Sequence, residues 1–521
     1  MSLLDTASLL LTPNAYKEGK LYSVIPSDGS GDFTFTRATS ATRVNSEGLI
    51  EVVSLLGNEL VTNGDFANGT TGWSNGNSGV NTIVNGYLVV TGTGGSYASA
   101  KQVFPVVAGR KYIVSGQIAR VSGIYEVGFE VNDGAGSGWN IIGTKTTSSD
   151  FVNVSEIITV NSGATQLDLR ATIFNVTVDN TNSLKLDNVS VKEVITNNIP
   201  RLDYSLGGCP NILLEPQRTN LALYSSSFDN AAWSKTGITV TPNQGIAPDG
   251  TLTMDLITFD SAARATTQGI SVTSGATYTF SVWLATQSGT QTVDIGNVNT
   301  STFQSVTVTT TPQRFEVTQV ASASTRYPAI RSTAAYSIFA WGAQLEAGAY
   351  ATSYIPTTTA SVTRNADVCS KTGVSSLIGQ SEGTIFFDGV INGCQNASAN
   401  LINSERNTNT SFSIGYIKAS KRIIAYVYDG AQKGTIQGGT FEIGQRVRLA
   451  YAYKSADFAL YANGVLIGTS TNAFTFPSTI DDIFIGDSIT YFNFQEAITN
   501  NATAIWKERL TNDQLAQLTT I

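Results

Sequence analysis

FTFTRATSATRVNSEGLIEVV at 33–53 and NIPRLDYSLGGCPNILLEPQRTN at 198–220 are the two stretches that decide how this chain is organised. Each alternates polar and apolar residues, turns at a Gly-containing corner and ends in an apolar run, a pattern typical of short strands. Neither half is complete by itself, and the segment between them has its own start, core pattern and end. We therefore predict a small β connector module, residues 1–55 plus 196–220, interrupted by an inserted domain.

Composition favours an all-β, multidomain protein. The chain has 521 residues, which is enough for roughly three or four domains that each bury a core. It contains 48 Gly and only 13% charged residues, and Ser, Thr, Asn, Val and Ile recur in short alternating runs between turn residues. This pattern predicts tandem β-sandwich (jelly-roll) domains on the connector module.

The charge pattern argues against several kinds of partner. Lys and Arg number 31 against 39 Asp and Glu, and no basic stripe is present, so neither nucleic acid nor an anionic membrane surface is expected as a partner. No window approaches the roughly 20 apolar residues of a membrane span, so membrane insertion is not expected. The opening MSLLDTASLLLTPN has an acidic residue and no basic segment, which does not resemble a signal peptide.

The absence of histidine removes much catalytic chemistry. With no His, the chain lacks Ser-His-Asp and Cys-His activation and His-based metal sites. The three cysteines, Cys209, Cys369 and Cys394, are scattered and odd in number, which predicts ordinary thiols formed in a reducing compartment. Glu126 and Glu130 are the nearest thing to a paired-acid motif, and solvated surface is the favoured interpretation for them. We expect no enzymatic activity and no required cofactor.

Residues 56–195 are predicted to form the inserted jelly roll, and residues 221–365 a second jelly roll of similar plan. The inserted domain opens NELVTNGDFANGTTGW and closes LKLDNVSVKEV, and the second domain repeats these phrases as LYSSSFDNAAWSKTG and SIFAWGAQLEAG. The segment ATSYIPTTTASVTR that follows reads as an extended linker. Four tryptophans lie inside the phrases that define the repeat and are expected in the cores: Trp73, Trp233, Trp283 and Trp341.

Residues 366–521 are predicted to form a different β domain that ends in a short helix. Its strands are separated by turns, and Asn463-Gly464 predicts a hairpin with a type I′ turn. In the tail ERLTNDQLAQLTT, Thr511 is placed as the N-cap of the helix, with leucines along one side.

Several phrases resemble known families. TRATSATRVNSEGLIE joined to PRLDYSLGGCPNILLEPQRTNL resembles an adaptor of bacteriophage tail-fibre and structural proteins, in which the two phrases usually follow one another directly. WGAQLEAGAYATSYIPT and DFALYANGVLIG fit the same source. The inserted domain resembles carbohydrate-binding jelly rolls, and residues 366–521 resemble laminin-G and concanavalin-like lectins.

These resemblances imply a virion fibre protein, either tail-borne or capsid-decorating, assembled in the host cytoplasm. They imply a homotrimer that attaches to other virion proteins through its N-terminal region and binds host surface polysaccharide with several weak sites. Two alternatives stay open. One is a purely structural decoration or spacer without a glycan site, and the other, less favoured, is a capsule depolymerase.

A sugar site needs an exposed aromatic ring and a few polar partners. Trp139, in the Gly-rich loop AGSGWN, is the first candidate; the alternative is that it packs locally. The further candidates are tyrosines of the C-terminal domain, for which the alternative is burial in the core or in a subunit contact: Tyr426, Tyr428, Tyr453, Tyr461 and Tyr491.

A structural calcium ion is the one metal considered. Some relatives of the carbohydrate-binding jelly rolls hold calcium where the first and last strands meet, and the resemblance places Asp65 and Asp187 there. The alternative is that Asp65 belongs to an Asn-Gly-Asp turn and Asp187 accepts backbone N–H groups.

Overall fold

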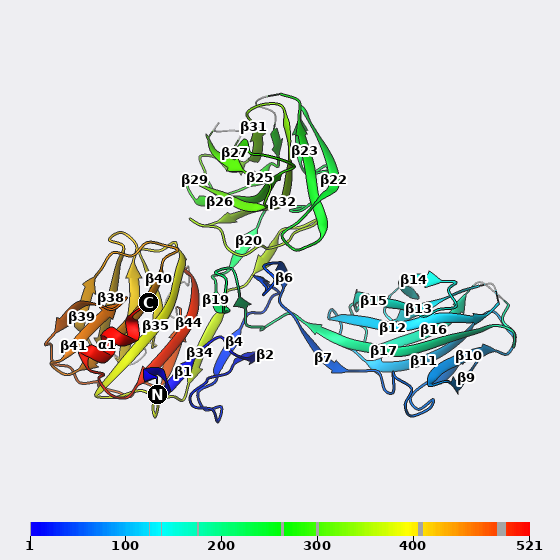
Figure 1. Ribbon diagram of the computed structural model, residues 1–521, viewed down its shortest axis with the longest axis horizontal. Coiled ribbons are helices and arrows are strands. Elements are labelled where there is room, and N and C mark those ends of the chain that lie inside the picture. Colours follow the sequence, from blue (N-terminus) through cyan, green and yellow to red (C-terminus); the bar gives the residue numbers. More distant parts are fainter. Residues whose placement is uncertain are drawn as a thin grey trace. The chain divides into compact units, whose positions relative to one another are not determined.

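The computed structural model describes residues 2–123, 125–136, 138–174, 177–261, 265–297, 302–404, 410–486 and 496–521 (Figure 1). Within these ranges nearly all regular structure is β-strand arranged in tandem sandwiches, which confirms the predicted all-β class. The chain divides into two compact units, Ser54–Ile195 and the remainder, residues 1–53 with 196–521. In the described ranges no helix combines the length and the apolar character needed to cross a membrane.

The unit Ser54–Ile195 is a sandwich of two antiparallel sheets. One sheet has the strand order β15-β12-β17-β10-β9, with β7 paired to β17, and the other has the order β14-β13-β16-β11-β8. Side chains that alternate along these strands fill the core between the sheets. The strands are β7 (Leu55–Glu59), β8 (Ser74–Asn77), β9 (Gly79–Val84), β10 (Tyr87–Gly92), β11 (Ala98–Pro105), β12 (Lys111–Ser122), β13 (Glu126–Asn132), β14 (Asn140–Thr146), β15 (Val152–Thr159), β16 (Gln166–Phe174) and β17 (Ser183–Ile195).

A second sandwich repeats the five-strand order of each sheet. Its sheets have the orders β29-β26-β32-β23-β22 and β28-β27-β31-β24-β21, and the short strands β25 and β30 form a separate pair. The strands are β21 (Ser234–Thr236), β22 (Ile238–Ile246), β23 (Leu252–Phe259), β24 (Ala265–Thr267), β25 (Ile270–Ser271), β26 (Thr277–Thr286), β27 (Gln291–Asn297), β28 (Thr302–Val308), β29 (Gln313–Val320), β30 (Thr325–Arg326), β31 (Pro328–Ser332) and β32 (Tyr336–Ala347).

Equivalent side-chain hydrogen bonds also occur within each of the two sandwiches. The amide of Gln102 bonds both the N–H and the C=O of Thr62, at 2.7 and 3.0 Å, and Gln268 does the same to Leu223 at the same distances. The indole N–H of Trp73, like that of its counterpart Trp233, donates to the opening loop at 3.2 Å. Trp73 and Trp233 lie in the cores of their sandwiches, as expected, whereas Trp283 and Trp341 are buried in a separate cluster with Tyr354 outside the core. The opening phrases repeat because they build the same closure of the sandwich.

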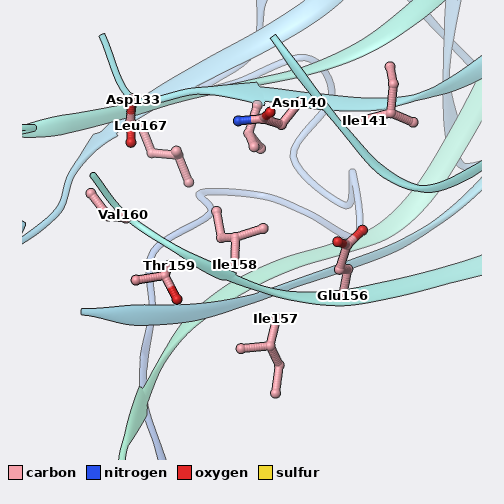
Figure 2. Close-up of a pocket in the computed structure, with 10 residues that line it drawn as sticks. Asp133, Asn140, Ile141, Glu156, Ile157, Ile158, Thr159, Val160 and Leu167 are labelled. Carbon is pink, nitrogen blue, oxygen red and sulfur yellow. The ribbon is translucent and has the colours of Figure 1, made fainter. Parts of the chain in front are cut away.

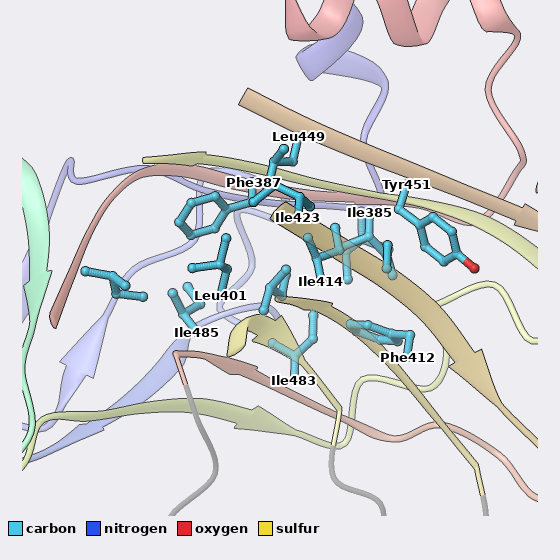
Figure 3. Packing of buried hydrophobic residues seen from close by; sticks show 14 of the residues in the cluster. Ile385, Phe387, Leu401, Phe412, Ile414, Ile423, Leu449, Tyr451, Ile483 and Ile485 are labelled. Atoms are coloured by element: carbon cyan, nitrogen blue, oxygen red, sulfur yellow. The ribbon is translucent and has the colours of Figure 1, made fainter. Parts of the chain in front are cut away.

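The third sandwich combines the two ends of the chain. Its sheets have the orders β18-β19-β44-β35-β40-β41-β42, with β1 paired to β44, and β2-β3-β4-β34-β43-β36-β37-β38-β39. Figure 3 shows the apolar core between them, to which Phe387, Leu401 and Ile485 contribute. The strands are β1 (Leu9–Leu11), β2 (Tyr16–Lys17), β3 (Lys20–Leu21), β4 (Phe33–Thr36), β18 (Leu202–Asp203), β19 (Asn211–Leu214), β34 (Val368–Thr372), β35 (Glu382–Cys394), β36 (Ser398–Asn403), β37 (Ser411–Ile417), β38 (Arg422–Tyr428), β39 (Gln432–Gly438), β40 (Arg446–Lys454), β41 (Phe458–Ala462), β42 (Val465–Ser470), β43 (Asp482–Ile485) and β44 (Glu496–Trp506).

The segments predicted as a separate connector therefore supply strands to the sheets of the C-terminal sandwich. β1, β2, β3, β4, β18 and β19 are each two to four residues long, too short to bury a core of their own. They gain one by extending the sheets of the C-terminal sandwich, in which β1 and β19 pair with β44 and β4 pairs with β34 (Figure 1). The chain leaves this sandwich once after Val53 and again after Asn220, each time to form a jelly roll.

Buried charges join the segments that meet at these exits. Arg37 donates to Asp367 at 2.8 Å with both side chains fully buried, and Arg201 contacts both Asp367 and Glu215. Arg364 lies 2.8 Å from Glu215. Burial alone would raise the pKa of Glu215, but Arg364 and Arg201 outweigh it and hold that pKa far below its usual range. The arginines of TRATSATR, PRLDY and SVTR are thus structural.

Two local predictions are confirmed, and one is wrong. Asn463 and Gly464 both have positive φ (48° and 80°) between β41 and β42, as a type I′ turn requires. Thr511 caps α1 (Asn512–Thr519) through its hydroxyl. The stretch after residue 350 is not an extended linker, because Tyr354 and Ile355 are buried and β33 (Val362–Arg364) pairs with β20 (Arg218–Asn220). The remaining strand pair is β5 (Thr42–Val44) with β6 (Ile50–Val52).

Candidate functional site

Trp139 lies on the surface of the inserted sandwich, directly before β14. Its side chain is 37% exposed, and the guanidinium carbon of Arg170 lies 3.9 Å from the centre of its ring. Arg170 is held in turn by Asp168, two residues earlier on β16, through bonds of 3.3 and 3.0 Å from Nε and Nη2. We call Trp139, Arg170 and Asp168 the first cluster. A cation on one ring face leaves the rest of the exposed indole to a ligand.

The strand pairing explains why these residues meet. Asp168 and Arg170 alternate with the buried Leu167 and Leu169, so both charged side chains point away from the core. Arg170 stands opposite Glu130 of β13. Glu130 accepts a hydrogen bond from Thr172 at 2.8 Å, and burial raises its pKa.

A separate cavity of about 370 Å³ is lined in part by Asn140 and Leu167, which are sequence neighbours of Trp139 and Asp168. Leu167 points into the core, whereas Asp168 and Arg170 point away from it, so the first cluster does not line this cavity. Figure 2 shows Asp133 and Asn140 near one side and Glu156 on another. Burial would raise the pKa of Asp133, but backbone N–H groups of Asn161, Ala135 and Gly136 outweigh it and lower that pKa. The remaining lining residues are Val131, Ile141, Ile157, Ile158, Thr159 and Val160.

The tyrosines predicted as sugar contacts do not form a surface platform. Tyr453 is fully buried and donates to the carbonyl of Gly379 at 2.7 Å, and Tyr461 packs in a buried cluster beside α1. These two predictions are wrong, because Tyr453 points into the core between the sheets and Tyr461 lies on the other face of its sheet, where α1 and its flanking residues cover it. Tyr428 is also buried, whereas Tyr426 is half-buried on β38. Tyr491 lies outside the described residues.

The two candidate calcium ligands form local bonds. An Asp65 carboxylate oxygen accepts the N–H of Ala67 at 3.2 Å, as in an Asx turn, and Asp187 accepts the N–H of Asn188 at 2.8 Å. The described residues contain no group of three or more His, Cys, Asp or Glu side chains placed to hold a metal. Calcium at Asp65 and Asp187 stays a prediction.

Sequence reasoning found Trp139 but missed its partners. The signal for them was present in QLDLRATIF, where Asp168 and Arg170 share a face at a spacing of two. The pairing of this strand with β13, and of β13 with β14, could not be read from the sequence. Glu126 and Glu130, the nearest acid pair, are engaged separately: Glu126 lies 3.6 Å from Lys145, and Glu130 bonds Thr172.

No protein-family model matches this chain, and no curated protein matches it. Several solved structures are similar to parts of it. The tandem CBM22 domains of Xyn10C from Paenibacillus barcinonensis share 14% identity over 57% of this chain and 98% of theirs, with a TM-score of 0.27. The CBM40 of a Ruminococcus gnavus sialidase, bound to α2,3-sialyllactose, shares 16% over 28% of this chain and 86% of its own, with a TM-score of 0.25.

Domain 4 of the arabinanase AbnA from Geobacillus stearothermophilus, in complex with arabinotriose, shares 12% identity over 33% of this chain and 82% of its own, with a TM-score of 0.26. These neighbours are β-sandwiches of the carbohydrate-binding-module type. The sugars belong to those proteins and do not assign a ligand to this chain. The resemblance to virion fibres and laminin-G lectins rests on the sequence motifs alone.

Proposed function

We propose that this chain binds glycans and that the first cluster contacts the sugar. The observation that carries the proposal is the exposed indole of Trp139, fixed on one face by Arg170. The apolar C–H face of a sugar ring stacks on exposed aromatic surface, and its hydroxyls bond to charged and amide groups at the rim. Asp168 and Arg170 supply such groups next to the ring.

The rigidity of the first cluster also supports this function. Because Asp168 holds the guanidinium of Arg170 at two points, little side-chain entropy is lost when a ligand binds. Among the described residues Nη1 of Arg170 has no hydrogen-bond partner, so it can donate to a sugar hydroxyl.

As the finer form of this proposal, the chain is a bacteriophage virion fibre protein, borne on the tail or capsid, that binds host surface polysaccharide without cleaving it. Its support is the resemblance of residues 33–53 and 198–220 to the phage adaptor. A homotrimer attached through the N-terminal region would carry several weak sites and gain avidity. Light scattering of the purified protein gives the subunit number, and a mass other than three subunits contradicts the trimer.

The test is adsorption of the isolated protein to host cells, with and without removal of surface polysaccharide. We expect saturable binding that is lost on stripping and is weakened at least tenfold by Trp139→Ala. The matched control is Tyr97→Ala, which removes a similarly exposed ring outside the first cluster of the same sandwich. Equal binding by Trp139→Ala and the parent would exclude the first cluster. No binding at all would favour a structural decoration, and release of reducing sugar would favour a depolymerase.

A further inference from the structure

A cluster of the same composition lies on the second sandwich. The guanidinium carbon of Arg331 on β31 lies 3.7 Å from the centre of the Phe303 ring on β28. Nε and Nη2 of Arg331 donate to Oδ2 of Asp294 on β27 at 3.2 and 2.6 Å, and Ser305 donates to Oδ1 at 2.6 Å. Phe303 is half-buried, which leaves part of its ring exposed. We call Phe303, Arg331 and Asp294 the second cluster.

The two clusters are built on corresponding strands with the same cross-strand pattern. The strands are β13, β14 and β16 in the inserted sandwich and β27, β28 and β31 in the second. Each arginine stands opposite a carboxylate: Arg170 faces Glu130, and Arg331 faces Asp294. Counted from the loop hydrogen bonds that correspond in the two sandwiches, Arg331 lies two residues further along β31 than Arg170 lies along β16. A shift of two residues leaves a side chain on the same face of the sheet.

The carboxylate that clamps the arginine comes from a different place in each sandwich. Asp168 precedes Arg170 on the same strand, whereas Asp294 reaches Arg331 from the neighbouring strand. The same arrangement of ring, guanidinium and carboxylate is thus reached through different positions. The packing of the common fold does not require this arrangement of ring, guanidinium and carboxylate, because any pair of polar residues could occupy these positions on the outer face of each sandwich.

We infer that the second cluster is a second sugar site, so that one chain carries two independent sites for neutral sugar rings; this rests on the proposed function. The buried Asp294 neutralises the guanidinium, so the site carries no net charge and presents the part-exposed Arg331 as a donor to a sugar hydroxyl. Within the described residues Nη1 of Arg331 has no hydrogen-bond partner, and the side chain is 31% exposed. An anionic sugar would gain little attraction, because Asp294 already neutralises Arg331.

The second site should be the weaker one. A phenyl ring offers less stacking area than an indole, and Phe303 is more enclosed by its neighbours than an exposed platform would be. Two weak sites on one flexible polysaccharide raise the overall affinity only when both can be occupied together. The first site therefore sets the affinity for short oligosaccharides, and the second adds stoichiometry.

The experiment is calorimetric titration of the full chain with cellohexaose, maltohexaose and laminarihexaose, and with hexagalacturonate as the anionic comparison. The variants are Trp139→Ala, Phe303→Ala, the double variant and Arg331→Lys, which keeps the charge but loses the two-point clamp. Circular dichroism shows that each variant is folded. We expect two sites in the parent for a neutral hexaose, loss of the weaker site in Phe303→Ala, and at least a tenfold loss at that site in Arg331→Lys.

Other outcomes separate the two claims. A single site abolished by Trp139→Ala and untouched by Phe303→Ala and Arg331→Lys overturns the second site and leaves the proposed function standing. Binding that needs Phe303 and not Trp139 supports the second site and overturns the first. Preference for hexagalacturonate at the site left in Trp139→Ala overturns the neutral-sugar assignment. No binding of any hexaose at millimolar concentration overturns both.

Discussion

The inserted and second sandwiches have the same topology, but the outer face of one sheet is polar in the first and apolar and covered in the second. Where β12 meets β17, a bulge places Gln117 opposite Asp187, and the matching bulge between β26 and β32 places Trp283 opposite Trp341. In the inserted sandwich Gln117 bonds Asn153 and Asn188 at 3.0 and 3.1 Å, and the face remains polar.

In the second sandwich the same face is covered. Trp283 and Trp341 pack with Tyr354, with ring centres 5.5 and 4.6 Å from it, and Ile50 of the N-terminal segment joins them. The difference shows that the same topology allows two kinds of outer sheet face. One is polar, and the other is apolar and packs against connecting segments of the chain. Side-chain polarity at the bulge decides which.

The largest loss of stability should come from removing an aromatic side chain of the cluster that covers this sheet face. Trp341→Ala leaves a large cavity among Trp283 and Tyr354 and should destabilise the unit by about 3–5 kcal/mol. The matched change Asp187→Ala, at the equivalent position of the inserted sandwich, should stay within about 0.5 kcal/mol. Denaturant unfolding followed by hydrogen exchange of β32 and β17 measures both. Similar losses at the two positions would contradict the contrast.

Loss of a buried carboxylate should also affect the stability of the two units differently. Glu215→Gln leaves Arg201 and Arg364 without their shared partner and should cost about 3–5 kcal/mol at neutral pH. Glu130→Gln, in the inserted sandwich, removes a carboxylate whose ionisation burial opposes, so it should not destabilise at neutral pH. Hydrogen exchange of each unit is the measurement, and a destabilised inserted sandwich in Glu130→Gln would contradict the second expectation.

Acid should separate the same two groups. The pKa of Glu215 is depressed in the fold, so its stabilisation is present above its unfolded pKa and is lost as pH falls below that value towards the folded pKa. The pKa of Glu130 is raised, so its contribution is greatest below the unfolded pKa and declines as pH rises through the folded one. Between neutral pH and about pH 4 the Glu130 contribution should therefore improve while that of Glu215 begins to fall. Variants lacking each group should lose the corresponding pH dependence.

A smaller and equal effect is expected where the sandwiches agree. Gln102→Ala and Gln268→Ala each leave a backbone N–H and C=O of the opening loop without their partner, at a cost of about 1–3 kcal/mol. The measurement is the free energy of unfolding of each sandwich. Costs that differ by more than the spread of repeat measurements would show that the two closures are not energetically alike.

Calcium should have the smallest effect. Only the inserted sandwich has carboxylates at both candidate positions; the second has Ser226 and Trp341 there. At a calcium concentration equal to Kd, the stabilisation would be only about 0.4 kcal/mol. Thermal unfolding with calcium and with chelator, for the parent and Asp65→Ala, measures it. A large shift that Asp65→Ala abolishes would establish the site.

Local patterns predicted much of this molecule, and non-local pairing limited the rest. The Asn463-Gly464 turn, the Thr511 cap and the burial of Trp73 and Trp233 follow from residues close in sequence. Tyr453 and Tyr461 were misjudged because their strands are buried on both faces, so alternation gives no outward side. The Arg170 contact with Trp139 depends on which strands are neighbours, which one sequence does not reveal.

The pairing of β1 with β44 limits when the C-terminal sandwich can fold during synthesis of the chain. The N–H of Ser8 donates to the carbonyl of Ile505 at 2.8 Å, and the Ser8 hydroxyl bonds the same carbonyl across 497 residues of sequence. During synthesis the two jelly rolls are finished and can fold while the first strand still waits for its partner. Leu10 can pair early with Ile25, but Leu9–Leu11 cannot pair with β44 until Glu496–Trp506 has been synthesised. A polypeptide that stops before β44 therefore cannot close the C-terminal sandwich.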